Sequence, residues 1–148
     1  MKKITPIIDD DHNTVNFILS DEERSTTVTA NNFDMDICFK ILEDIFMNSE
    51  SIELDDVLAL NDENTIVKAV SASASGKDCI TKAFKEAFSD GVTNTAAILI
   101  TVSKNRSFAE VDDFLSSDNF SKDGFVIWKV LKNKKLEESI RLDAIIFT

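Results

Sequence analysis

The chain has 148 residues, and its 27 acidic and 16 basic side chains give a net charge of −11. A protein this acidic repels phosphate groups, so we expect it to bind neither nucleic acid nor an anionic membrane surface. Its length fits a single core, and 43% apolar with 29% charged residues is typical of a globular fold.

The first half of the chain is acidic and the second is nearly neutral: residues 1–64 carry 16 acidic and 4 basic side chains. Short apolar segments predict strands over 4–8, 15–19 and 25–30, in an N-terminal segment (1–32) of unknown role. Ile37, Ile41 and Ile45 recur at helical spacing and predict an amphipathic helix over 33–48. An acidic loop over 51–56 then leads into a short helix through Val57 and Leu60.

The second half alternates strands and helices. The pattern predicts strands over 65–73, 96–103, 124–131 and 139–147, and helices over 76–89 and 107–117. Ser107 and Glu110 have the spacing of a capping box, and the apolar run 96–103 predicts a central strand covered on both faces. The short basic turn at 132–135 favours an antiparallel hairpin between the last two strands. We therefore expect an α+β fold, with a mixed four-stranded sheet and helices packed on it.

Several residue types are rare enough to exclude functions. The three glycines lie far apart, at 76, 91 and 124, so no Gly-rich loop can hold a phosphate, and we expect no cofactor. His12 is the only histidine, which excludes zinc sites with several imidazoles, and we expect no metal and a solvated His12. Cys38 and Cys79 form no C-x-x-C pair and are expected in the core of a cytoplasmic protein. We expect neither a secretory leader nor a transmembrane span.

Runs spread over 33–148 resemble the C-terminal domain of the FtsZ/tubulin family. They are SASG at 73–76, ILITVS at 98–103, FAEV at 108–111, VIW at 126–128 and IRLDAII at 140–146. Upstream, IELDDV at 52–57 is similar to the family's I-N-L-D-F-A-D-V loop with two residues missing. The chain departs from the family at Lys129, where the family has a glycine after the tryptophan, and it has no counterpart of the N-terminal GTP-binding domain.

The resemblance implies a function in filament assembly and cell division. In the family, the loop that resembles 52–57 inserts beneath the next filament subunit, and its acidic residues help to position the water that attacks GTP. The resemblance therefore assigns the contact to residues 52–57, which we name the interaction segment, and within it to Glu53, Leu54, Asp55 and Asp56. It implies a free-standing, non-enzymatic interaction domain that binds a tubulin-type subunit or itself, and that binds no GTP alone.

Two other functions stay open from the residues alone. The carboxylates at 53–56 could form the acidic site of a small enzyme, through a divalent cation or a general base. The fold could also serve a small-molecule sensor. The alternative to both is that these carboxylates have only a structural role, because acidic residues ahead of a helix stabilise the positive end of its dipole.

Overall fold

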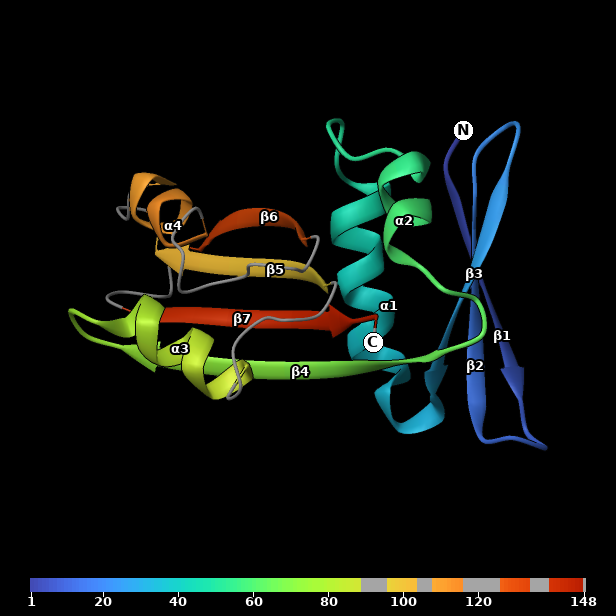
Figure 1. Ribbon diagram of the computed structural model, residues 1–148, viewed down its shortest axis with the longest axis horizontal. Coiled ribbons are helices and arrows are strands. Elements are labelled where there is room, and N and C mark those ends of the chain that lie inside the picture. The colour runs from blue at the N-terminus through green and yellow to red at the C-terminus, as the bar shows by residue number, and fades with distance from the viewer. Residues whose placement is uncertain (89–95, 104–107, 116–125, 134–138, 148) are drawn as a thin grey trace.

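Strands dominate the computed structural model, which describes residues 1–88, 96–103, 108–115, 126–133 and 139–147 (Figure 1). Within these ranges seven strands form one sheet, in the order β1-β2-β3-β4-β7-β5-β6. They are β1 (Lys3–Asp9), β2 (Thr14–Ser20), β3 (Ser25–Asn31), β4 (Ile66–Ser75), β5 (Ala96–Ser103), β6 (Val126–Asn133) and β7 (Ser139–Ile146). The α-helices are α1 (Met35–Leu42), α2 (Leu54–Leu60), α3 (Cys79–Ala87) and α4 (Phe108–Leu115). A 3-10 turn, η1 (Asn32–Asp34), precedes α1, and a π-helical turn, η2 (Glu43–Met47), continues it.

The fold is α+β as predicted, but the prediction of a four-stranded sheet was wrong. The strands predicted near 4–8, 15–19 and 25–30 form an antiparallel meander, β1–β2–β3, that joins the sheet. The joint is narrow, because Thr29 and Ala30 of β3 pair in parallel with only Ile66 and Val67 of β4. Such a short contact leaves no pattern in the sequence. The division of the chain at residue 32 stays a prediction.

The antiparallel hairpin predicted between the last two strands is also wrong. β5 lies between β6 and β7, parallel to β6 and antiparallel to β7. β7 pairs on its other side with β4, so it is a central strand of the sheet. The connection from Asn133 to Ser139 is long enough for this path, since two strand spacings are only about 10 Å. A short connection therefore did not require direct pairing.

The sheet of β4, β7, β5 and β6 separates two hydrophobic clusters. Along β5, Ala97 and Leu99 belong to the first cluster, whereas Ile98 and Ile100 belong to the second. This alternation confirms the prediction of a central strand covered on both faces, because successive strand side chains point to opposite faces. The second cluster packs α3 and α4 on the sheet, and these helices lie together over one end of it in Figure 1.

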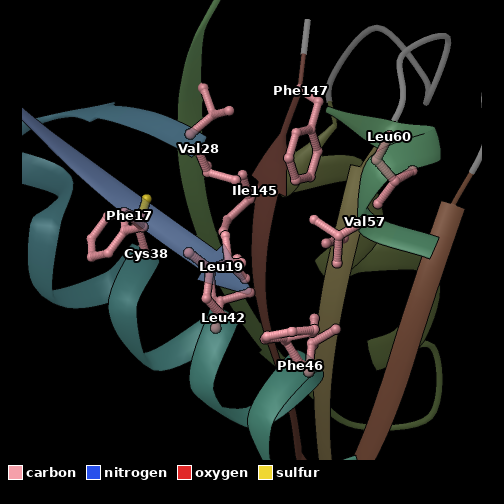
Figure 2. Packing of buried hydrophobic residues seen from close by; sticks show 14 of the residues in the cluster. Phe17, Leu19, Val28, Cys38, Leu42, Phe46, Val57, Leu60, Ile145 and Phe147 are labelled. Carbon is pink, nitrogen blue, oxygen red and sulfur yellow. The ribbon is translucent and has the colours of Figure 1, made fainter. Parts of the chain in front are cut away.

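The first cluster joins the meander, α1, α2 and the sheet (Figure 2). Figure 2 shows Phe17 of β2 beside Cys38 of α1, and Val57 and Leu60 of α2 beside Phe147. The helix predicted over 33–48 is confirmed as the continuous series η1, α1 and η2. The N-terminal meander is thus packed on the same helix as the rest of the fold.

The two cysteines are free and buried, as predicted for small core residues. Burial, with the nearby charge of Asp34, raises the pKa of the Cys38 thiol to about 12. Because this native pKa lies above that of an unfolded cysteine, the thiol's contribution to stability is present below about pH 9 and is lost as the pH rises toward 12.

We expect iodoacetamide at about pH 8 to leave Cys38 unmodified in the native protein, since only the thiolate reacts and burial blocks access. Mass spectrometry of the alkylated protein measures this, with a guanidinium-unfolded sample as the control. Equal alkylation rates in the two samples would contradict the burial of the thiol.

Candidate functional site

The interaction segment forms the start of α2, where a loop was predicted over 51–56. Glu53 is the N-cap residue, and Leu54, Asp55 and Asp56 form the first turn. The Glu53 N–H donates to a carboxylate oxygen of Asp56 over 2.8 Å, and the Asp56 N–H donates to the Glu53 carbonyl over 3.0 Å. These bonds satisfy backbone groups that a helix N-terminus leaves open, and the carboxylates stabilise the positive end of its dipole.

The four predicted contact residues have different surroundings. The Leu54 side chain is only 1% exposed and belongs to the first cluster, so it anchors α2 and is not available to a partner. Glu53 and Asp55 are exposed, and Asp56 is half-buried. The accessible carboxylates of the segment are therefore mainly those of Glu53 and Asp55.

Asp55 forms an ion pair with Arg24, which lies in the turn between β2 and β3. The guanidinium Nη1 is 2.5 Å from the Asp55 Oδ1, and the side chains are 48% and 71% exposed. The hydrogen bond with Asp55 raises the pKa of Arg24. Within the turn, Asp21 accepts the N–H groups of Glu23 and Arg24, and these bonds lower the pKa of Asp21. The turn thus directs Arg24 toward α2.

Lys2 fixes the connection between η2 and α2. Its Nζ donates to the carbonyl oxygens of Phe46 (3.0 Å), Ser49 (2.7 Å) and Ile52. The same ammonium group lies 5.2 Å from the centre of the Phe46 ring. The last carbonyls of a helix lack intrahelical donors and carry the negative end of its dipole, so a lysine at this place stabilises it.

Lys129 of β6 contacts the same connection from the sheet. Its Nζ donates to the carbonyl oxygens of Asp44 (3.0 Å) and Asn48 (3.1 Å). This residue stands where the resembling family has a glycine. The departure therefore has a structural consequence here, because the side chain binds the C-terminal end of η2.

The far end of α2 is attached to β3. The Asn61 Nδ2 donates to the Thr26 hydroxyl (2.9 Å) and to the Thr27 carbonyl (2.8 Å). Glu63 accepts from the Thr26 hydroxyl (3.1 Å) and the Thr27 N–H (2.9 Å). Both ends of α2 are thus bound to the meander, which fixes the direction of the interaction segment.

Sequence reasoning missed the basic residues Lys2, Arg24 and Lys129 that act on this site. The one signal was indirect: residues 43–56 contain six carboxylates and no basic side chain. Arg24 pairs with one of these carboxylates, whereas Lys2 and Lys129 donate to backbone carbonyls of the segment. Which basic residue does so depends on tertiary contacts that the sequence does not reveal.

Among the other residues considered from the sequence, those that the structure describes form no site. His12 is exposed, and its Nδ1 lies 2.8 Å from the carboxylate of Asp9, whose pKa it lowers. Phe147 is buried in the core and Trp128 is half-buried against the second cluster, while Phe125, Ser107 and the lysines at 134 and 135 lie outside the described residues. Across the described ranges, no three His, Cys, Asp or Glu side chains are grouped to hold a metal. None of the helices in these ranges is long and apolar enough to cross a membrane.

The structure is similar to FtsZ. A mutant FtsZ from M. jannaschii aligns with a TM-score of 0.60 and 16% identity, over 78% of this chain and 38% of that one. An empty FtsZ dimer from M. jannaschii aligns with a TM-score of 0.58 and 18% identity, over 73% and 35% of the two chains. The chain thus spans less than two fifths of these FtsZ chains. No protein-family model and no curated protein matches the sequence. At such identities the likeness shows the fold alone, which is FtsZ-like.

Proposed function

We propose that this chain corresponds to the C-terminal domain of FtsZ and acts by protein contact. Its interaction segment binds the nucleotide end of a tubulin-type subunit, with Glu53 and Asp55 toward the partner. The observation that carries the proposal is the interaction segment itself: its sequence resembles the family's contact loop, and its accessible carboxylates lie on a helix turn bound to the rest of the fold at both ends.

The FtsZ-like fold supports the proposal at a coarser level. Fold alone does not determine function, so the proposal depends on the segment and not on the likeness. The 148-residue chain lacks a Gly-rich phosphate cradle, so it would bring the acidic contact surface of a subunit without a nucleotide surface. A head-to-tail contact that cannot propagate stops growth, and we therefore expect the domain to cap one end of a filament.

Sedimentation of filament-forming FtsZ with GTP tests this function. Substoichiometric wild-type protein should lower the mass of pelleted polymer. The double substitution Glu53→Gln and Asp55→Asn should weaken the effect, because it removes both accessible charges and keeps the side-chain shapes. Asp56 stays unchanged because it caps α2.

The matched control is Asp112→Asn with Asp113→Asn, which removes two exposed charges from α4. It should cap as the wild type does. Exposed substitutions away from helix caps, such as this control, change the free energy of unfolding by no more than about 0.5 kcal/mol. Circular dichroism checks that all the proteins are folded. Equal polymer mass with and without the wild-type protein would exclude capping.

The enzyme and sensor functions stay predictions, because no feature of the described residues favours either. The absence of GTP binding also stays a prediction. Titration of a labelled GTP analogue against the isolated chain checks it, and micromolar binding would contradict it.

A further inference from the structure

We infer that the N-terminal meander, β1–β3, sets the conformation of the interaction segment, and that Arg24 is the positioning residue through which it does so. This inference rests on the proposed function for its biological meaning, but its structural part can be tested without a partner. The meander lies outside the 33–148 region that resembles the family. It would therefore be a feature of this chain and not of the family's contact loop.

Arg24 is presented from a defined turn. The Asp21 carboxylate accepts the N–H groups of Glu23 (2.8 Å) and Arg24 (2.9 Å), and the Asp21 N–H donates to the Arg24 carbonyl (3.1 Å). These bonds fix the backbone from which the guanidinium reaches Asp55. An Asp side chain that binds the backbone two residues on in this way forms an Asx-turn.

The interaction segment gathers negative charge at one place in the fold. Glu53, Asp55 and Asp56 lie at the N-cap and in the first turn of α2, at the positive end of its dipole. Arg24 places a positive charge beside the central one, at 2.5 Å. Lys2 acts one residue before this turn, at the carbonyl of Ile52. The two residues, both from the meander end of the chain, thus bind the segment at its entry and in its first turn.

The ion pair is suited to positioning more than to stability. Arg24 and Asp55 are 48% and 71% exposed, and exposed pairs contribute little to the free energy of unfolding. The pair still restricts where the Asp55 carboxylate points and how often the first turn of α2 opens. A partner would then meet an ordered surface in which Arg24 and Asp55 are paired.

Hydrogen–deuterium exchange of the free protein tests the inference. Arg24→Ala should speed exchange of the hydrogen-bonded Glu53 and Asp56 amides by roughly 3- to 5-fold, the factor expected for loss of an exposed ion pair. Exchange in β5 should not change. Arg24→Lys should restore most of the protection, because it keeps the charge. Lys85→Ala is the matched control, since it removes an exposed cation from α3 and should leave the segment unaffected.

A double-mutant cycle with Asp55→Asn tests whether Arg24 acts through Asp55. In the Asp55→Asn background, Arg24→Ala should leave exchange of these amides unchanged, because the carboxylate that it pairs with has lost its charge. In the filament assay, Arg24→Ala should need a several-fold higher concentration for the same loss of polymer, and Arg24→Lys should behave as the wild type does.

The possible failures are separate. Unchanged exchange in Arg24→Ala, or an equal effect of Arg24→Ala in the wild-type and Asp55→Asn backgrounds, would overturn the positioning role. Weaker capping by Arg24→Ala with unchanged exchange would also overturn it, and would assign Arg24 to the contact itself. If the wild-type chain leaves filaments unaffected while exchange follows the expected pattern, the proposed function fails and the positioning of the segment stands.

Discussion

Replacing Phe46 with alanine should lower the free energy of unfolding by about 3–5 kcal/mol, the usual cost of removing a buried phenyl ring. Phe46 lies in η2, is fully buried, and belongs to the first cluster, which packs α1 and η2 against the sheet (Figure 2). Its ring also lies under the Lys2 ammonium group. The truncation therefore leaves a cavity and removes the aromatic face from a lysine that fixes the next turn.

Phe33→Ala provides the matched control at the other end of the same helical series. Phe33 is 85% exposed, so its truncation should change the free energy of unfolding by no more than about 0.5 kcal/mol. Urea unfolding followed by circular dichroism measures both. Similar losses for the two variants would contradict the packing described for the first cluster.

Asp143→Ala should also lower the free energy of unfolding strongly, by about 2–4 kcal/mol. Asp143 lies in the central strand β7 and is only 1% exposed. Its carboxylate accepts from the Ser71 hydroxyl of β4 (2.6 Å) and from the Arg141 Nε (3.2 Å). Removing one partner of a buried charged pair costs several kcal/mol, and the cost is reduced here because Arg141 is 54% exposed and can return to water.

Asp143→Asn separates the charge from the hydrogen bond. An asparagine oxygen can still accept from Ser71. The free energy of unfolding of Asp143→Asn should therefore be higher than that of Asp143→Ala by about 1 kcal/mol or more. Asp112→Ala on the exposed face of α4 is the control for loss of a carboxylate and should be nearly neutral. Equal stability of Asp143→Ala and the wild type in urea would show that the Ser71–Asp143–Arg141 contacts do not stabilise the sheet.

Local patterns predicted the elements well and their arrangement less well. The apolar run at 96–103 identified β5 as a central strand, and the spacing of Ile41 and Ile45 identified the helix, because these signals depend on burial of neighbouring residues. The place of β7 between β4 and β5 could not be predicted, since strand order depends on pairing across the whole chain. The same holds for the joint of the meander at Thr29 and Ala30.

The candidate site was likewise predicted only in part. Composition and resemblance identified its carboxylates, but the prediction placed them in a loop, because acidic residues favour both turns and helix starts. The burial of Leu54 and the contacts of Lys2 and Lys129 were missed. Lys2 lies 44 residues from Phe46 and Lys129 lies 85 residues from Asp44 in the sequence. No short-range pattern links residues so far apart.

The place of β7 has a consequence for synthesis on the ribosome. The elements from β1 to α2 follow one another in the chain. Their part of the first cluster can therefore pack while the later residues are still being made. The other sheet strands cannot close in this way, because β7 emerges after both strands that it joins. Until then β4 and β5 keep unpaired edges, which other chains can add to. Acidic residues concentrated in the part made first would keep the nascent chains apart during this interval.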